Sequence, residues 1–428
     1  MPTSCRATFE LVVFLRAFSG VAGPWSLVHG PRGGPDRRRF ALSAATAPRW
    51  FPCAAFLAGL AALTGAAAQP PALAAERGAL QWQTFPDAAK FRVLGLHWVE
   101  ENAPHLWRLP AQAMGAMPKG VQGRAKCPSG ARIVFRSTAS RLAVRAAAVS
   151  GGNLARLEAW VNGVAQRPAP ARKEGADTEV LVYDGGDSAE KEFVIYLPHL
   201  QEVTVKAIGT DEAARFSPLP PRFAESRPVV FYGSSVCQGS AAQSPAQTYP
   251  AIVSRQLNLD FVNLGFGGAG KAEPEVVRHV TSLPGCAYVF DLGKSYGSQD
   301  SSAFMAMLQT IRRDHPQAPI IVVTPITSAK EVREADYSAQ SLHTRKVMRD
   351  PARELIRAGD PRIVVVEGED LLGFQEHHLL SRDGVHPSDE GYRVIAVRLA
   401  PVLRQALAPT TPTSSRVQSA RQGGNQHP

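Results

Sequence analysis

The chain has 428 residues, long enough for two or three domains, and its 44% hydrophobic and 20% charged residues are typical of a globular protein. The net charge of +10 comes largely from the ends: residues 1–75 carry seven arginines and two acidic residues, and residues 408–428 carry two more arginines. About +3 is left for residues 76–408, too little for a phosphate-binding face, so we expect no nucleic-acid partner.

Residues 1–75 have the pattern of a targeting segment. Arg37-Arg38-Arg39-Phe40 precedes an apolar run from Cys53 to Ala68, and small residues at Ala66-Ala67-Ala68 and Ala72-Leu73-Ala74 suit signal-peptide cleavage. The Arg-Arg-x-Phe pattern resembles a twin-arginine export signal, and the run is short for a membrane span of about 20 residues. We therefore expect export to the periplasm or the extracellular space, without a stable membrane span in the mature chain. An uncleaved N-terminal anchor and an organelle presequence are the alternatives.

The cysteines give no sign of a disulfide scaffold or a metal site. Cleavage near residue 70 leaves three of the five, which permits at most one disulfide. No pair has metal-ligand spacing, and we expect neither a metal nor another cofactor.

Residues 80–216 are predicted to form an all-β sandwich of the jelly-roll type. Short runs alternate between apolar and polar residues and are separated by clusters of Gly, Pro and Asp, a pattern typical of antiparallel strands. Turn signals stand at Asn162-Gly163 and Asp184-Gly185-Gly186. The strand candidates are residues 131–136, 142–145, 157–161, 179–183 and 192–197.

Residues 217–227 are rich in proline and are predicted to be a linker between two domains. Residues 228–407 then alternate short apolar runs with helical patterns, which predicts a three-layer α/β/α domain with a parallel sheet. Residues 408–428 are interpreted as a disordered tail. The strand candidates are 228–232, 260–264, 286–291, 318–324 and 362–366; the helix candidates are 246–257, 272–282, 300–314, 339–358 and 388–407.

The turn Gly233-Ser234-Ser235 follows the first of these strands. A hydroxyl there lies near a helix start, where free backbone N–H groups favour developing negative charge. By chemistry alone Ser234 and Ser235 both qualify as a nucleophile. The alternative is a serine-rich helix cap without a catalytic role.

The segment Asp383-Gly384-Val385-His386 lies just before the last predicted helix. A carboxylate three residues before an imidazole can bond one ring nitrogen, and the other nitrogen can then take the proton of a serine. A capping histidine in an ordinary Asp-Gly turn is the alternative. His377 and His378 are rivals for this role, but neither has an acid placed so regularly.

The run Asn263 to Gly270 is rich in glycine and follows the second strand of the parallel sheet. Its glycines allow backbone N–H groups to approach a ligand, which suits an oxyanion-hole loop. A tight strand-to-helix connection explains the same glycines. A phosphate-binding loop is a poor interpretation, because no Gly-Lys-Ser/Thr closes the run.

Together these motifs resemble the SGNH (GDSL-type) hydrolase superfamily over residues 228–407, and a two-domain branch with an N-terminal β-sandwich over residues 80–407. The resemblance rests on Gly233 to Gly239, on Asn263 to Gly270 and on the Asp-x-x-His segment. Two motifs of the sandwich, Arg108-Leu109-Pro110 and Tyr196-Leu197-Pro198, also match the branch. It implies that Ser235 is the nucleophile, that Asp383 and His386 complete a triad, and that the N–H groups of Ser235 and Gly268 hold the oxyanion.

The chain departs from the family where an asparagine side chain is expected as an oxyanion donor. The corresponding stretch, Asp291 to Tyr296, contains none, and Lys294 or Ser295 is the substitute available. Losing one oxyanion donor typically lowers turnover by about 10²–10³-fold. A slow enzyme or an altered substrate choice is consistent with this change.

The sequence therefore predicts a serine esterase that cleaves short-chain, acetyl-like esters through an acyl-enzyme. The resemblance makes a small molecule or a carbohydrate the expected ester partner. Acyl transfer to an alcohol by the same residues is one alternative. A carbohydrate-binding protein with a weak or lost hydrolase activity is the other.

Overall fold

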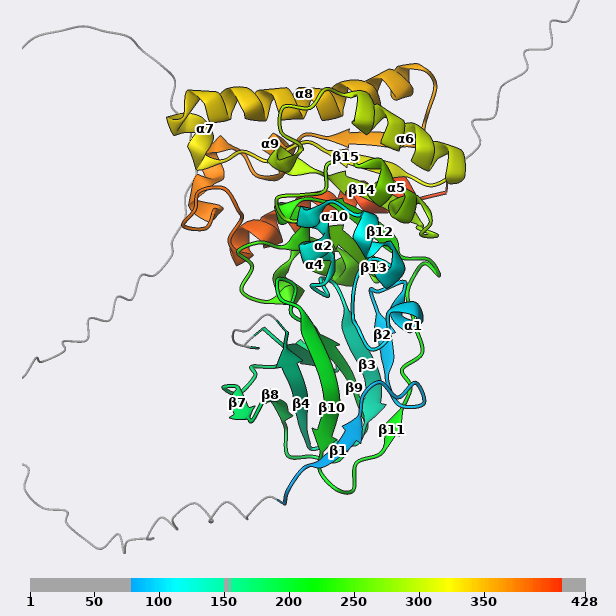
Figure 1. Ribbon diagram of the computed structural model, residues 1–428, viewed down its shortest axis with the longest axis vertical. Helices are drawn as coiled ribbons and strands as arrows, with labels where there is room; N and C mark the ends of the chain where they lie inside the picture. The colour runs from blue at the N-terminus through cyan, green and yellow to red at the C-terminus, as the bar shows by residue number, and fades with distance from the viewer. Residues whose placement is uncertain (1–77, 150–153, 155, 410–428) are drawn as a thin grey trace, which may run out of the picture. The chain divides into compact units, whose positions relative to one another are not determined.

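The computed structural model describes residues 78–149, 154 and 156–409 (Figure 1). The predicted targeting segment and nearly all of the predicted tail lie outside these residues. The described residues all belong to one compact unit, so their mutual contacts can be read directly. The division into two domains at residues 217–227 stays a prediction.

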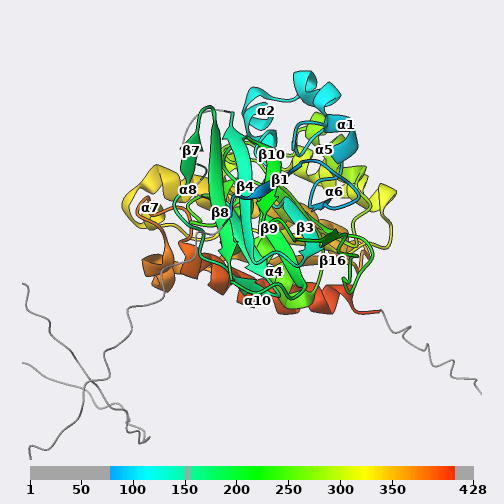
Figure 2. The same cartoon turned by 90° about the horizontal axis from the view of Figure 1, so that it is seen from below.

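Two antiparallel sheets form the N-terminal part of the described chain (Figures 1 and 2). Their inward faces share one core, in which Phe135 stacks on Phe193 with ring centroids 5.2 Å apart and Val180 and Val182 approach from the other sheet. The β-sandwich prediction is confirmed. One sheet runs in the order β1 (Gln81–Thr84), β10 (Val203–Thr210), β4 (Arg141–Ala148), β8 (Asp177–Asp184) and β7 (Arg172–Glu174). The other runs β11 (Phe216–Ser217), β3 (Arg132–Ser137), β9 (Lys191–Tyr196), β5 (Glu158–Val161) and β6 (Val164–Ala165), with β2 (Arg92–Leu94) paired to β3.

A parallel sheet forms the C-terminal part, as predicted. Its order is β13 (Phe261–Gly265), β12 (Val229–Gly233), β14 (Ala287–Asp291), β15 (Ile320–Val323) and β16 (Ile363–Val366). Every residue of β12 is buried because helices cover both faces of the sheet. Val229 and Phe231 pack towards α4 (Tyr249–Leu257) and α10 (Asp389–Leu407). Val230 and Tyr232 pack towards α5 (Pro274–Thr281), α6 (Ser302–Asp314) and α8 (Ala335–Arg357).

The strand order places the first strand of this sheet between the second and the third. In open α/β sheets, ligands bind outside the carboxyl ends of the strands, where the strand order reverses. The elements at this edge are α3 (Ser235–Gln238), η3 (Gly293–Tyr296), α7 (Ala329–Arg333) and the segment that leads into α10. The remaining short elements are η2 (Pro245–Gln247), α9 (Gly368–Leu371) and η4 (Phe374–Leu379).

A helical excursion interrupts the sandwich region and was not part of the sequence prediction. It comprises α1 (Val99–Asn102), η1 (Ala111–Ala116) and α2 (Lys119–Ala125). Met114, Met117 and Val121 recur every three or four residues and pack into the same core as Leu264 and Phe266 of the α/β part. The excursion therefore joins the sandwich to the parallel sheet.

Arg108 holds this junction together. Its side chain is fully buried, yet it contacts no carboxylate among the described residues. Instead its guanidinium donates to the carbonyl oxygens of Cys127 (2.7 Å), Arg124 (2.6 Å), Asn263 (2.8 Å) and Gly265 (2.6 Å). It also lies over the ring of Phe266, 4.7 Å from the centroid. Burial lowers the pKa of Arg108 to about 10, which leaves it charged at neutral pH.

We expect Arg108→Met to lower the free energy of unfolding by about 3–5 kcal/mol, because it leaves buried carbonyl groups without donors. Denaturant unfolding of the full chain measures this. Arg136→Met is the matched control, since Arg136 pairs with Glu192 in a half-exposed position and should cost about 1 kcal/mol or less. Equal losses in the two variants would contradict the role given to Arg108.

Candidate active site

Ser235 begins α3 directly after the carboxyl end of β12. The turn that presents it requires glycine: a Cβ atom at Gly233 would lie 2.0 Å from the carbonyl oxygen of Asp291. The N–H of Ser234 donates to that same oxygen at 2.9 Å. The close approach of β12 and β14 thus sets the sharp strand-to-helix turn that leaves the Ser235 hydroxyl at the edge of the sheet.

A chain of hydrogen bonds connects Ser235, His386 and Asp383. His386 Nε2 is 2.8 Å from Ser235 Oγ, and His386 Nδ1 is 2.6 Å from Asp383 Oδ2. The other carboxylate oxygen of Asp383 accepts from the backbone N–H groups of Val385 and His386 and from Ser381 Oγ, at 2.8–2.9 Å. Burial by itself would raise the pKa of Asp383, but these hydrogen bonds outweigh it and hold that pKa well below its usual range. The carboxylate is therefore ionised and fixes the ring.

The rivals Ser234 and His377 make other contacts, although Ser234 lines the same pocket as Ser235. Ser234 is buried, and its Oγ would be 2.5 Å from a Cβ atom placed on Gly293, so its side chain is directed to that glycine. His377 Nε2 lies 3.2 Å from Thr327 Oγ1. The contact with His386 thus separates two serines that residue chemistry alone left open, and it is made by Ser235, the serine that the family resemblance implies.

The glycine-rich loop after β13 lies beside Ser235. The N–H of Gly267 donates to Gln238 Oε1 at 2.7 Å, and Gln238 Nε2 donates to the carbonyl of His199 at 3.1 Å. Gly268 has a φ of +75° and borders the same pocket as Ser235. Within the described chain, neither the N–H of Ser235 nor that of Gly268 donates to another protein group, so both remain available to an oxyanion.

Lys294 and Ser295, the predicted substitutes for the asparagine, border the pocket from η3. The ammonium of Lys294 forms an ion pair with Glu331 at 2.7 Å and donates to the carbonyl of Ile326 at 2.9 Å. Burial lowers the pKa of Lys294 to about 8, and Glu331 partly opposes this shift. Two of its three N–H groups are thus engaged on the side of α7.

The pocket has a volume of about 400 Å³ and includes residues that the sequence analysis did not single out. Asp291 ends β14, and its position at the carboxyl end of a parallel strand could have identified it as a site residue from the sequence. Arg124 comes from α2, and Tyr337 and Gln340 come from α8. No local motif marks these three, because they reach the site only through the packing of distant helices.

The described part of the chain contains no group of three or more His, Cys, Asp or Glu side chains placed to hold a metal ion. Cys127, Cys237 and Cys286 are buried and unpaired. Burial raises the pKa of each of these thiols, which makes them poor nucleophiles.

Two family models match the chain. Residues 226–404 match the GDSL-like lipase/acylhydrolase family, and residues 80–216 match the N-terminus of an SGNH-type esterase. A search among curated protein sequences found no match.

Solved structures share this fold at low sequence identity. A protein from Bacteroides ovatus ATCC 8483 described as a GDSL-like lipase has a TM-score of 0.67 and 21% identity, over 77% of this chain and 98% of its own. A salicylyl-acyltransferase, SsfX3, from a tetracycline biosynthetic pathway has a TM-score of 0.63 and 24% sequence identity, over 77% of this chain and 99% of its own. A family two carbohydrate esterase from Cellvibrio japonicus has a TM-score of 0.53 and 16% sequence identity, over 77% of this chain and 98% of its own.

Asp291 makes the free energy of unfolding of the chain depend on pH. Burial raises the pKa of Asp291 to about 7, and the hydroxyl of Tyr249 opposes this only in part. In the unfolded chain an aspartate has a pKa of about 3.9. Between these values the folded state keeps a proton that the unfolded state releases, so the free energy of unfolding decreases as the pH rises from about 4 to about 7.

We expect Asp291→Asn to remove this contribution and to flatten the pH dependence of the free energy of unfolding over that interval. Denaturant titrations of the full chain at about pH 4.5 and about pH 7.5 measure it. Asp336→Asn, at an exposed position in the first turn of α8, is the control. The same decrease in wild type and Asp291→Asn would rule this explanation out.

Proposed function

We propose that this chain cleaves short-chain acyl esters through a covalent acyl-enzyme on Ser235. It belongs to the SGNH (GDSL-type) hydrolase superfamily and is a carboxylic ester hydrolase. One observation supports this most directly: His386 bridges the hydroxyl of Ser235 and the carboxylate of Asp383 with contacts of 2.8 and 2.6 Å. These are the distances expected of a nucleophile, its general base and the group that orients the base.

In the proposed first step Ser235 Oγ attacks the ester carbonyl while its proton passes to His386 Nε2. Asp383 keeps the proton on Nδ1 and stabilises the imidazolium. The carbonyl oxygen becomes an oxyanion and accepts from the N–H groups of Ser235 and Gly268. His386 then gives its proton to the leaving alcohol as the carbon–oxygen bond breaks. A water molecule, deprotonated by His386, releases the acid and restores the Ser235 hydroxyl.

We propose that Lys294 and Ser295 take the place of the asparagine that the family uses. Lys294 and Ser295 both line the pocket, and each side chain carries a hydrogen-bond donor. The buried charge of Lys294 adds electrostatic stabilisation of the oxyanion in a site of low dielectric constant. The ion pair with Glu331 limits this effect, because it holds the ammonium on the side of α7.

The proposed substrate is a small acyl group on a polar alcohol, such as an acetylated carbohydrate. Ser240, Tyr337, Gln340 and Arg124 give the pocket side chains that can hydrogen-bond a polyol. A volume of about 400 Å³ suits a short acyl chain together with one sugar unit. The carbohydrate esterase among the structural relatives supports the same substrate class.

We also propose that the protein is exported, on the basis of the twin-arginine-like segment in residues 1–75. In the part of the chain that the structure describes, every helix is too short or too polar to cross a membrane.

Hydrolysis of 4-nitrophenyl acetate by the full chain tests the proposed reaction. We expect Ser235→Ala to lower kcat by at least about 10³-fold, because the nucleophile is lost. Ser234→Ala is the matched control and should stay within about tenfold of wild type, since Ser234 does not contact His386. Loss of activity in Ser234→Ala alone would contradict the assignment. Formation of a glycerol ester when glycerol is added would identify acyl transfer instead of hydrolysis.

Gln238 is expected to position the oxyanion loop. Gln238→Ala removes the bond to the N–H of Gly267, one residue before the proposed donor Gly268. We expect kcat to fall by about 10–100-fold while KM changes by less than about threefold, because only the transition state carries the oxyanion.

Gln243→Ala is the matched control for this change, since Gln243 is the same residue type at an exposed position. Its kcat and KM should equal those of wild type. A proportional rise in KM without a change in kcat would show that Gln238 serves substrate binding instead.

A further inference from the structure

Arg124 brings a positive charge from α2 to the pocket that contains Ser235. Its Nε donates to the carbonyl oxygen of Gly267 at 3.1 Å, one residue before Gly268, the proposed oxyanion donor. The side chain is exposed, and within the described chain its two terminal amino groups donate to no protein group and meet no carboxylate at ion-pair distance. Arg124 therefore borders the pocket with hydrogen-bond donors that remain available to a substrate.

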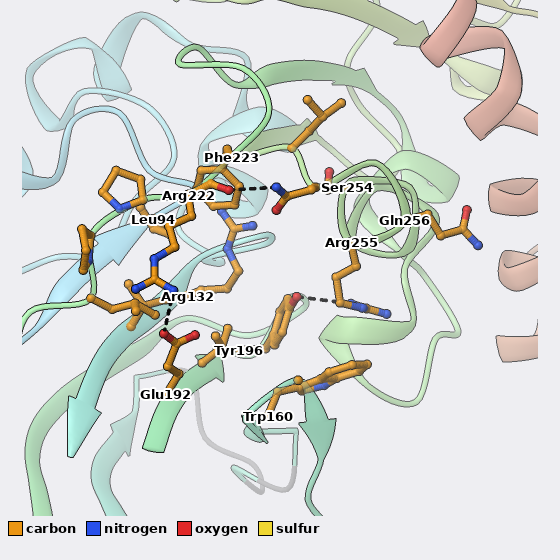
Figure 3. Close-up of a pocket in the computed structure, with 18 residues that line it drawn as sticks. Leu94, Arg132, Trp160, Glu192, Tyr196, Arg222, Phe223, Ser254, Arg255 and Gln256 are labelled. Atoms are coloured by element: carbon orange, nitrogen blue, oxygen red, sulfur yellow. Dashed lines mark hydrogen bonds and ion pairs between the residues drawn. The ribbon is translucent and has the colours of Figure 1, made fainter. Parts of the chain in front are cut away.

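The arginines that line a larger cavity, at the sandwich and residues 219–223, are engaged by contrast (Figure 3). Two of them meet acidic side chains, and the third donates to a tyrosine hydroxyl and lies over a tryptophan ring. These contacts are Arg132 with Asp260, Arg222 with Glu192, and Arg255 with Tyr196 and Trp160. Each of these guanidinium groups has a protein partner at its terminal nitrogens, whereas that of Arg124 has none in the described chain.

The charges next to the glycine loop are mainly positive. Arg108 donates to backbone carbonyls of the strand that leads into this loop and has no carboxylate partner among the described residues. Asp291 is the one acidic residue of the described pocket wall, and burial raises its pKa to about 7, so it is only partly ionised at neutral pH. Two nearby carboxylates are occupied, Glu331 by Lys294 and Asp383 by the proposed general base. A substrate with a negative charge is therefore favoured over a neutral one.

The shape of the free group narrows the kind of anion. A guanidinium presents parallel N–H groups that match the two oxygens of a carboxylate, and such charge-assisted pairs are stronger than bonds to neutral hydroxyls. Because Nε of Arg124 is held by the carbonyl of Gly267, the terminal amino groups stay close to the loop that carries the proposed oxyanion donor. The carboxylate that they suit must then lie a short distance from the ester carbonyl.

We propose that Arg124 makes this chain selective for esters that carry a carboxylate within a few bonds of the scissile carbonyl. This inference rests on the proposed cleavage at Ser235 and names its substrate class. The carboxylate accepts from the terminal amino groups of Arg124 while the ester carbonyl lies at Ser235. It belongs to either the alcohol or the acyl part of the ester, and the experiment distinguishes the two. The pairing adds no covalent step to the reaction.

Two pairs of alkyl esters test the proposal with the full chain. O-acetylglycolate carries a carboxylate in its alcohol part, and monoethyl succinate carries one in its acyl part. Acetoxyacetamide and ethyl succinamate are their neutral amides of nearly the same size. We expect kcat/KM of an acid to exceed that of its amide by at least about tenfold, in the pair whose carboxylate reaches Arg124. Equal kcat/KM of acid and amide in both pairs would overturn the proposal.

Arg124→Met separates recognition of the charge from support of the glycine loop. We expect the ratio of kcat/KM for acid and amide to fall to about one, because the cation is lost. Loss of loop support alone would lower both substrates alike and leave the ratio unchanged, which would overturn the proposal. Arg124→Lys keeps a charge and should retain part of the preference. Arg357→Met, at an exposed arginine in the last turn of α8, is the matched control and should keep the wild-type ratio.

The same measurements distinguish failure of this inference from failure of the proposed function. Cleavage of 4-nitrophenyl acetate and of the neutral amides that is lost in Ser235→Ala, without a preference for either acid, would overturn the selectivity alone. Absence of hydrolysis of all these esters by the wild type would overturn the proposed function and this inference with it.

Discussion

One buried cation joins the two halves of the described chain. Arg108 is surrounded by carbonyl oxygens and no carboxylate, so its charge is balanced by backbone dipoles from two different parts of the fold. Two of these carbonyls belong to Asn263 and Gly265, at the end of the strand that leads into the glycine loop. The position of that loop therefore depends on a residue of the sandwich region, and the sandwich region supports the candidate active site.

A second connection reaches the same loop through Gln238. His199 follows the last long strand of the second sheet, and its carbonyl accepts from Ser129 and Gln238. Burial lowers the pKa of His199 to about 3, so the ring is neutral and its Nε2–H donates to the carbonyl of Gly239. Gln238 then holds the N–H of Gly267. Arg108 and Gln238 thus fix the proposed oxyanion loop before substrate arrives, which is the condition for efficient electrostatic catalysis.

The charged groups near the pocket differ in how deeply they are buried and in what holds them in place. Arg345 is buried and makes a bidentate pair with Glu331, and Glu331 also holds Lys294. This cluster anchors η3 to α7 and α8 and keeps a positive charge close to the site where the family's asparagine is absent. Asp383, by contrast, is about half exposed and is held by local hydrogen bonds alone. The proposed site therefore combines one rigid wall with an orienting carboxylate, Asp383, that its own turn positions.

The sequence by itself determined the features that depend on neighbouring residues. Alternation of period two predicted the sandwich, buried runs between helical patterns predicted the parallel sheet, and the spacing of Asp383 and His386 predicted their contact within one turn. Residue chemistry alone left two serines open, and the resemblance pointed to Ser235; the contact of Ser235 with His386 spans 151 residues and belongs to the tertiary structure. The tertiary structure also decided that Arg124 and Tyr337 reach the pocket. These features arise where separate elements pack together, and no local pattern encodes which distant surfaces meet.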